Sequence, residues 1–344
     1  MFSMKIAMDA MGGDQAPGVV VQGSVEAVRD LGVSVILVGD EQALDRELAK
    51  TGPVSSRISI KHCTQVAAMD EPPIEVLRRK KDSSVRVAFE LVKLGEAQAA
   101  VSAGNSGATL AVATVVLGRM NGVERPGVAS ILPSVQEQFI IIDVGVNLDC
   151  KPSFLIQFGV MAHAYAREIL EMERPRLALL SIGEEDSKGN LLVRQTHDLF
   201  KKSSLNFIGN IEGRDLFSGQ ADIVVCDGFV GNVVLKLSEG LTEIINGMLQ
   251  QELNTGPWPR ADVMILQDVF KRFRKKVDYA EFGGAPLLGV NGVGVISHGR
   301  SSPRAIKNAI RTAAEFVRLK MPERLQAGLE ESRELIASTR PKRH

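Results

Sequence analysis

The stretch KIAMDAMGGDQAP, residues 5–17, decides the fold class, because an apolar run ends there in a loop of glycine and aspartate before a helical pattern begins. Four later runs end in the same way: AAVSAGNSGA at 99–108, FIIIDVGVN at 139–147, LALLSIGEED at 177–186 and DIVVCDGFVGN at 222–232. A parallel sheet collects the carboxyl ends of its strands at one edge, where glycine lets backbone N–H groups approach a ligand and a helix N-terminus favours an anion. The sequence therefore predicts one composite anion site.

Apolar strand-like runs alternate with helical patterns along most of the chain. We predict strands near 4–9, 34–38, 57–61, 98–102, 139–143, 176–182, 222–226 and 293–297, and helices near 17–31, 83–94, 107–118, 153–171, 188–203, 230–253, 261–277 and 302–318. The strands are apolar almost throughout, which is typical of strands covered by helices on both faces. The pattern predicts an α/β fold with helices on both sides of a mostly parallel sheet, and a charged surface helix over 322–344.

The segment 230–278 breaks this alternation, because two long helical patterns follow each other directly. It predicts a protruding helical hairpin within one α/β domain over 1–340, and a division of that domain into two lobes stays open. The first helix carries an apolar face that indicates core or dimer contact: Val233, Leu237, Leu241, Ile244 and Met248.

Composition excludes several classes of protein. Lys plus Arg and Asp plus Glu both number 41 in 344 residues, so no overall charge attracts nucleic acid. No run approaches the ~20 apolar residues of a transmembrane helix, and the N-terminus lacks the layout of a signal peptide, so we expect a cytoplasmic protein. Cys63, Cys150 and Cys226 are widely spaced, which argues against disulfides and a zinc site, and burial in an apolar strand should raise the pKa of Cys226.

The loop Gly104–Gly107 resembles a nucleophile elbow, but Ala108 stands where G-x-S-x-G requires its second glycine. A strand, then Gly-Asn-Ser-Gly, then a helix suits phosphate better, because loop N–H groups, the Ser106 hydroxyl and the helix dipole all favour an anion. The alternative is a tight turn in which Ser106 only caps the helix.

Lys188 lies in a second strand-to-helix loop that is not a Walker A sequence. Two interpretations stay open for it: a surface ion pair with neighbouring carboxylates, or a cation that holds phosphate or a developing oxyanion. No G-x-G-x-x-G follows a strand, so a nicotinamide cofactor has little support. We expect no cofactor and no metal.

Polar residues at strand ends supply further candidates. Asp9, Asp143 and Asp227 should accept loop N–H bonds and fix loop shape, because a carboxylate repels phosphate. Asparagine can donate to an oxyanion without that repulsion, and the candidates are Asn105, Asn147 and, as the strongest, Asn232. His298 ends a strand before glycine and is the one histidine with the position of a site residue.

Seven loops in order make the pattern specific. They are MDAMGGDQAP, SAGNSGATL, DVGVNLDCKP, IGEEDSKGN, FIGNIEGRDL, CDGFVGNVVLK and EFGGAPLLGV, and they span nearly the whole chain. Together they closely resemble the PlsX family of bacterial phosphate acyltransferases. Ser106, Val146, Leu148 and Ser187 depart slightly from the family pattern, and none of these changes removes a polar group that the chemistry needs.

The resemblance implies an activity, a fold and partners. The acyl group of acyl-[acyl carrier protein] would move to inorganic phosphate, giving acyl phosphate for phosphatidic acid synthesis. The fold would be like that of the isocitrate and isopropylmalate dehydrogenases and the phosphate acetyltransferases. The resemblance also implies a homodimer that associates with the inner membrane face and with the downstream glycerol-3-phosphate acyltransferase.

In this hypothesis the catalytic residues are Lys188, Asn232 and His298. The 104–107 loop and Lys188 hold phosphate against the thioester carbonyl, Asn232 stabilises the oxyanion, and His298 protonates the departing thiolate. The residues expected to bind phosphate and substrate are Asp9, Gly12, Gly13, Gly104, Asn105, Ser106, Gly107, Asp143, Asn147, Asp227, Gly228 and Gly231.

The second helix of the hairpin mixes aromatic and basic residues, which favours contact with an anionic membrane or an acidic carrier protein. The residues concerned are Trp258, at the tip of the hairpin, and Phe270, Lys271, Arg272, Phe273, Arg274, Lys275 and Lys276 of the second helix. Two alternative functions stay open: a phosphate acetyltransferase that uses coenzyme A thioesters, and a non-catalytic scaffold that binds acyl carrier protein.

Overall fold

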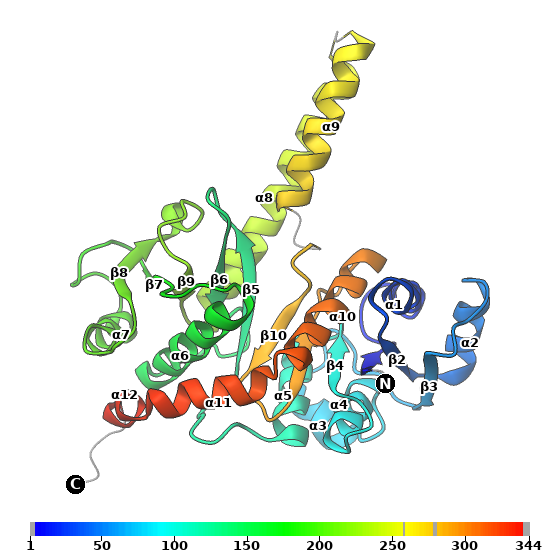
Figure 1. Ribbon diagram of the computed structural model, residues 1–344, viewed down its shortest axis with the longest axis horizontal. Coiled ribbons are helices and arrows are strands. Elements are labelled where there is room, and N and C mark those ends of the chain that lie inside the picture. The colour runs from blue at the N-terminus through cyan, green and yellow to red at the C-terminus, as the bar shows by residue number, and fades with distance from the viewer. Residues whose placement is uncertain (1–3, 257–258, 278–280, 340–344) are drawn as a thin grey trace.

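The computed structural model describes residues 4–256, 259–277 and 281–339. In this part of the chain, eleven strands form one sheet in the order β3-β2-β1-β4-β11-β10-β5-β6-β9-β7-β8 (Figure 1). Their bounds are β1 Lys5–Asp9, β2 Ser34–Gly39, β3 Ile58–His62, β4 Ala99–Ser102, β5 Gly127–Pro133, β6 Gln138–Ile142, β7 Leu177–Ser181, β8 Phe207–Glu212, β9 Ile223–Val225, β10 Ala285–Leu288 and β11 Val293–Ile296.

The sheet contains two parallel blocks. Strands β3, β2, β1, β4 and β11 run parallel to one another, and so do β6, β9, β7 and β8. Between the blocks, β10 pairs antiparallel with β11 and with β5, and β5 pairs antiparallel with β6. These three reversals make the two blocks run in opposite directions. The strand ends therefore form two groups on two edges, which corrects the expectation of a single edge.

Helices cover both faces of the sheet, as predicted. Alternate residues of β6 enter different cores: Ile140 and Ile142 belong to one, and Phe139 and Ile141 to the other. The helices are α1 Gly18–Leu31, α2 Glu41–Ala49, α3 Pro73–Arg79, α4 Ser84–Lys93, α5 Ser106–Leu117, α6 Pro152–Ile169, α7 Leu191–Lys201, α8 Gly228–Thr255, α9 Arg260–Val277, α10 Pro303–Arg318, α11 Met321–Glu331 and α12 Arg333–Ser338, with a 3₁₀ turn at Gly213–Asp215.

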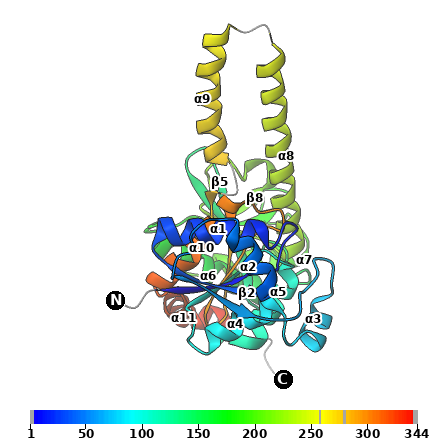
Figure 2. The ribbon, with the colours of Figure 1, turned by 90° about the vertical axis from the view of Figure 1, so that its right-hand side faces the viewer.

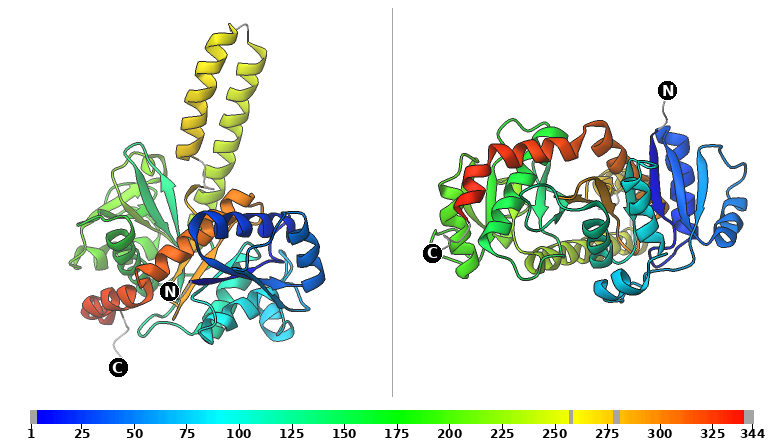
Figure 3. Two further views of the ribbon diagram at one scale, coloured as in Figure 1. Left: turned by 45° about the vertical axis from the view of Figure 1, so that its right-hand side comes forward. Right: turned by 90° about the horizontal axis from the view of Figure 1, so that it is seen from below.

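The C-terminal helices join the two blocks. Helix α10 packs on α1, and α11 packs on α6, so these helices run from one block to the other (Figure 3). Met321, Leu325 and Leu329 are buried in the core cluster that both blocks share. The predicted surface helix over 322–344 corresponds, within the described residues, to α11 and α12, whose charged residues are exposed and flank this buried apolar stripe.

The hairpin stands away from the sheet, with α8 and α9 side by side (Figure 2). On α8 the predicted apolar face points away from the core: Leu237 is 68% exposed and Met248 is 65% exposed. Core contact is therefore the wrong interpretation of this face. Trp258 lies outside the described residues, as do the side chains of Arg274 and Lys275. Among the helices of the described ranges, none combines the length and apolarity that crossing a membrane requires.

Candidate functional site

The first group of loops meets around the buried carboxylate of Asp9. The Ser102 hydroxyl donates to Asp9 Oδ2 at 2.7 Å, and the Gly104 N–H donates to Ser102 Oγ at 3.1 Å. A Cβ on Gly12 would lie 2.5 Å from Asp9 Oδ2 and 2.8 Å from the Gly104 nitrogen, so only glycine permits this approach of two backbones. Burial raises the pKa of Asp9, against the hydrogen bond from Ser102, which lowers it.

Helix α5 begins at this cluster with its N-terminus arranged by Asn105. Asn105 Oδ1 accepts from the Ala108 N–H at 3.0 Å, and its Nδ2 donates to the carbonyls of Met69 and Glu71, each at 2.9 Å. Asn105 is therefore the helix cap, and the alternative of Ser106 as the cap is wrong. Ser106 is exposed at the first position of the helix, where N–H groups and the helix dipole favour an anion.

His298 belongs to the same cluster. The Asp14 N–H donates to the Gly299 carbonyl at 2.8 Å, which ties the loop after β11 to the loop after β1. His298 Nδ1 accepts from the Arg300 N–H at 3.1 Å, so the proton of a neutral imidazole is on Nε2, which lies 3.5 Å from Glu239 Oε2. Burial raises the pKa of Glu239, while the charge of His298 lowers it.

The second group of loops meets around Asp143, at the end of β6. Asp143 Oδ1 accepts from the Val128 N–H at 2.8 Å, and Oδ2 accepts from the backbone and side-chain nitrogens of Asn147 at 2.7 and 3.0 Å. The carboxyl is fully buried, and this burial raises its pKa to about 6 although all these hydrogen bonds lower it. Asp143 therefore fixes loop shape, as the sequence predicted.

The backbone of the first turn of helix α8 packs very close to Asp143. Asp227 caps it by accepting from the Val230 N–H at 3.0 Å. A Cβ on Gly231 would lie 1.9 Å from the Asp143 carbonyl oxygen, and one on Gly228 would lie 2.7 Å from Asp143 Oδ2. No side chain fits at either position, so the two glycines set the direction in which α8 leaves the sheet.

The three candidate asparagines differ in what their side-chain amides can do. Both Nδ2 hydrogens of Asn105 are bonded to carbonyls, and those of Asn147 are bonded to Pro126 O and Asp143 Oδ2. Neither asparagine can donate to a substrate oxyanion in this arrangement. Within the described part of the chain, the amide of Asn232 makes no hydrogen bond, and it lies beside Gly145, whose Cβ would come within 3.1 Å of Asn232 Cγ.

Lys188 lies on the same edge as the second cluster, because β7, β9 and β6 are adjacent and parallel. It is exposed, and its N–H donates to the Glu185 carbonyl at 2.9 Å. The ion pairs of this loop within the described residues join Asp186 to Lys201 and to His197. The ammonium of Lys188 makes none with a described carboxylate, so the interpretation of Lys188 as part of a surface ion pair is wrong.

Helix α8 connects the two clusters. Its first turn rests on Asp143, and Glu239, eleven residues after Gly228, reaches His298 in the first cluster. At 1.5 Å per residue these points are roughly 16 Å apart along the axis. Asn232 and Glu239 are seven residues apart and therefore lie on the same face of α8. Asn232 and Glu239, the partner of His298, therefore lie on the same side of the helix.

Sequence reasoning missed Ser102, Gly145 and Glu239. Ser102 ends a strand like the predicted aspartates do, and this position was a usable signal. Nothing local marks Glu239, since its partner is remote in the chain. No group of three described His, Cys, Asp or Glu residues is placed to hold a metal ion. Burial raises the pKa of Cys226 as predicted, and raises those of Cys63 and Cys150 to about 12, so these thiols are poor nucleophiles.

Comparison with solved structures shows the class of fold. The chain is similar to a phosphotransacetylase from Streptococcus pyogenes, with a TM-score of 0.63, 20% identity and coverage of 93% of this chain and 94% of that one. It is also similar to 4-hydroxythreonine-4-phosphate dehydrogenase from Klebsiella pneumoniae, with a TM-score of 0.54, 13% identity and coverage of 92% and 100%. These likenesses confirm the predicted fold class.

The chain belongs to the family described as "Fatty acid synthesis protein", which matches residues 4–324, and this confirms the resemblance to the PlsX family. It is 51% identical over 326 residues to a protein named phosphate acyltransferase in Nitratidesulfovibrio vulgaris strain DP4, covering 94% of each chain. It is 51% identical over 327 residues to one of the same name in Geobacter sulfurreducens, covering 95% and 94%.

The buried carboxyl of Asp143 makes stability depend on pH. Its folded-state pKa of about 6 exceeds the ordinary 3.8, so the folded protein binds the proton more tightly than the unfolded chain does. Stability from this group is present below pH ~4 and is lost as the pH rises through ~6, by roughly 3 kcal/mol. We expect the difference in unfolding free energy between wild type and Asp143→Asn to fall by that amount from pH ~4 to pH ~7 in urea titrations. A difference that stays constant with pH would contradict this.

Proposed function

We propose that this chain transfers a fatty acyl group from acyl-[acyl carrier protein] to inorganic phosphate and so forms acyl phosphate for phospholipid synthesis. The chain is an enzyme of the phosphate acyltransferase kind, as its relatives over nearly the whole length are. The observation that carries the proposal is Asn232, whose amide stays available on the face of α8 that also reaches the His298 cluster.

The chemistry fits a site without a protein nucleophile. A phosphate oxygen attacks the thioester carbonyl carbon, the C–S bond breaks, and the proton of the attacking phosphate ends on the departing sulfur. Phosphate is anionic near neutral pH and a thiolate leaves readily, so neither a serine nor a cysteine triad is required. The raised pKa values of Cys63, Cys150 and Cys226 agree with this, because a protonated thiol attacks poorly.

The position of each residue determines its proposed role in the reaction. The N-terminus of α5 with Ser106 binds phosphate through N–H groups and the hydroxyl. Asn232 donates to the tetrahedral oxyanion, and Lys188, on the same edge of the sheet, adds positive charge. His298 carries a proton on Nε2 and donates a hydrogen bond from it to the departing sulfur, which takes its own proton from the attacking phosphate. Asn232 and Glu239 are about 10 Å apart along α8, a span that phosphate and thioester fill together.

Product trapping tests the reaction. Purified protein is incubated with palmitoyl-[acyl carrier protein], with and without phosphate, and hydroxylamine then converts acyl phosphate into a hydroxamate. We expect hydroxamate above the protein-free background only when phosphate is present. Carrier binding without loss of thioester would favour the scaffold alternative, and faster turnover of acetyl-CoA than of the palmitoyl carrier would favour the acetyltransferase.

Removal of the two proposed charge-stabilising groups tests the site. We expect Lys188→Ala and Asn232→Ala each to lower kcat by ~10²-fold or more, as loss of an oxyanion donor does. The matched control is Lys202→Ala, which removes another exposed lysine from the same block and should keep turnover. Near-normal turnover of Lys188→Ala would remove this residue from the mechanism.

The hairpin serves association in this proposal. Its exposed α8 face, with Leu241 at 55% and Ile244 at 57% exposure, suits a second copy of the chain in a homodimer. The exposed Lys271, Arg272 and Lys276 of α9 suit an anionic membrane surface or an acidic carrier protein. Contact of α9 with anionic lipid would keep the enzyme at the inner face of the membrane.

Liposome sedimentation tests the membrane contact. We expect the protein to pellet with vesicles that contain anionic lipid and to pellet less with neutral vesicles, because each basic residue near the surface contributes about 1 kcal/mol. Lys271→Glu with Arg272→Glu should reduce pelleting. Arg46→Glu with Lys50→Glu, at the C-terminal end of α2, changes charge equally and should not reduce pelleting. Equal, negligible pelleting with both kinds of vesicle would exclude the membrane role.

A further inference from the structure

The segment that follows β3 lies beside the N-terminus of α5, and we call its residues 66–72 the Met69 loop. Strand β3 is parallel to β2 and β1, so this segment leaves the sheet at the same edge as the loops after β1, β4 and β11. Helix α3, which follows the Met69 loop directly, packs on α5. The Met69 loop is therefore a neighbour of the first loop cluster.

Hydrogen bonds hold the Met69 loop in place. Lys80 Nζ donates to the Val66 carbonyl at 2.6 Å and pairs with Glu71 Oε2 at 2.5 Å. Asn105 Nδ2, from the cap of α5, donates to the Met69 and Glu71 carbonyls at 2.9 Å each. The ion pair is largely shielded from water, because only 27% of the Lys80 side chain and 19% of the Glu71 side chain are exposed. These contacts fix the backbone of Met69 relative to α5.

The Met69 side chain reaches from the cap of α5 to the loop after β11. Its backbone carbonyl is bonded to Asn105, and its Cε lies so close to Gly299 that a Cβ there would be 2.6 Å from it. Ser106, which is proposed to bind phosphate, follows Asn105 in the chain. His298, which is proposed to contact the departing sulfur, precedes Gly299. Met69 therefore lies between the two groups that hold the reacting molecules in the proposed function.

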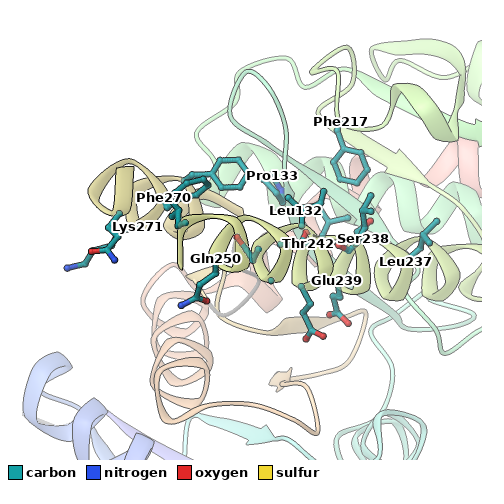
Figure 4. Close-up of a pocket in the computed structure, with 18 of the residues that line it drawn as sticks. Leu132, Pro133, Phe217, Leu237, Ser238, Glu239, Thr242, Gln250, Phe270 and Lys271 are labelled. Atoms are coloured by element: carbon teal, nitrogen blue, oxygen red, sulfur yellow. Dashed lines mark hydrogen bonds between the residues drawn. The ribbon is translucent and has the colours of Figure 1, made fainter. Parts of the chain in front are cut away.

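His298 has neighbours of different polarity on two elements. On α8, Glu239 Oε2 lies 3.5 Å from His298 Nε2, and Figure 4 shows the Glu239 carboxylate pointing away from Phe217. Toward the Met69 loop the neighbour is apolar, because the thioether of Met69 ends at Gly299. The site therefore has a charged wall on α8 and an apolar wall at Met69.

The apolar wall is exposed in the free protein. Met69 is 44% exposed, and so are, to a similar degree, Val66 at 39% and Ile74, at the start of α3, at 51%. Exposed apolar side chains stabilise the fold little, since they take little surface from water. A substrate that covers Met69 would complete its burial, and this burial favours binding.

Acyl transfer to phosphate has to compete with hydrolysis at the same carbonyl group. In hydrolysis a water oxygen attacks the carbonyl carbon, the C–S bond breaks, and one proton of the water ends on the sulfur, giving fatty acid and thiol. Groups that stabilise the oxyanion for phosphate stabilise it for water as well. An apolar side chain beside the carbonyl group excludes water and offers it no hydrogen-bond partner. The flexible thioether of methionine also adapts to the shape of a ligand.

We infer that Met69 contacts the bound thioester and keeps water from its carbonyl group, so that phosphate accepts the acyl group instead. This inference rests on the proposed acyl transfer and adds the acceptor specificity of the site. Met69 acts by contact and by exclusion of water, and it takes no part in proton transfer.

Replacement of Met69 tests the inference through the choice of acceptor. Thiol release from palmitoyl-[acyl carrier protein] without phosphate reports hydrolysis, and phosphate-dependent hydroxamate reports transfer, each above the protein-free background. We expect Met69→Ala to lower the ratio of transfer to hydrolysis at least ~10-fold, because it removes an apolar contact made with the bound substrate and admits water. Met69→Leu keeps the apolar volume, so its ratio should stay near that of the wild type.

Leu94→Ala is the matched control. It also removes an exposed apolar side chain, since Leu94 is 70% exposed, but Leu94 follows the C-terminal end of α4, at the edge of the sheet where β4 begins. Its ratio of transfer to hydrolysis should equal that of the wild type. If Met69→Ala is active and keeps the wild-type ratio, the inference is wrong.

Methionine oxidation measures the contact without turnover. Peroxide converts exposed methionine to its sulfoxide, which peptide mass spectrometry detects. The probe is S-hexadecyl-pantetheine, a thioether that cannot transfer an acyl group. With phosphate present, we expect a saturating concentration to slow oxidation of Met69 ~5-fold or more. Oxidation of the half-buried Met172, shortly after α6, should not change.

The two measurements separate this inference from the proposed reaction. Protection of Met69 in a protein that forms no acyl phosphate would support the contact while the proposed function fails. Formation of acyl phosphate, with no protection of Met69 and an unchanged ratio in Met69→Ala, would support the function and overturn the inference.

Discussion

The buried carboxylate of Asp143 is the interaction on which the rest of the site depends. It receives N–H groups from β5 and from the Val146–Asn147 turn, and the start of α8 packs directly on it. Burial raises the pKa of Asp143 more than these hydrogen bonds lower it. The resulting pKa of about 6 still leaves the carboxyl ionised at neutral pH. The carboxylate is kept because its bonds fix two loops and one helix in a single geometry.

Helix α8 carries the consequence of that geometry across the molecule. Gly228 and Gly231 allow its backbone to touch the end of β6, which sets its direction. That direction brings Asn232 and Glu239 onto the side where the loops of the other parallel block end. The same helix then continues as one arm of the hairpin. A small change at its first turn would therefore move the site and the hairpin together.

Local sequence patterns were a good guide where local physics controls the outcome. Each of the eight predicted strands appears near its expected position, and most are apolar almost throughout because helices cover both faces, with the edge strand β3 (ISIKH) as the exception. The remaining strands β5, β8 and β10 carry glycine, proline or polar residues within or beside them, as in GVASILP, FIGNIE and GGAPLL, and these residues look like loops. Asp143 and Asp227 were expected to bind loop N–H groups, and they do, since such bonds span only a few residues.

By itself the sequence determined the fold class, the family and the loops that carry the polar groups, because strand burial and glycine turns are written in adjacent residues. The tertiary structure decided which of those groups are available. Asn105 and Asn147 use their amides internally while Asn232 does not, and Glu239 meets His298 across fifty-nine positions of the chain. It also decided that the strand ends form two groups, because the antiparallel β10 and β5 reverse the sheet between them. Such pairings depend on where remote segments pack, and no local pattern of residues records that.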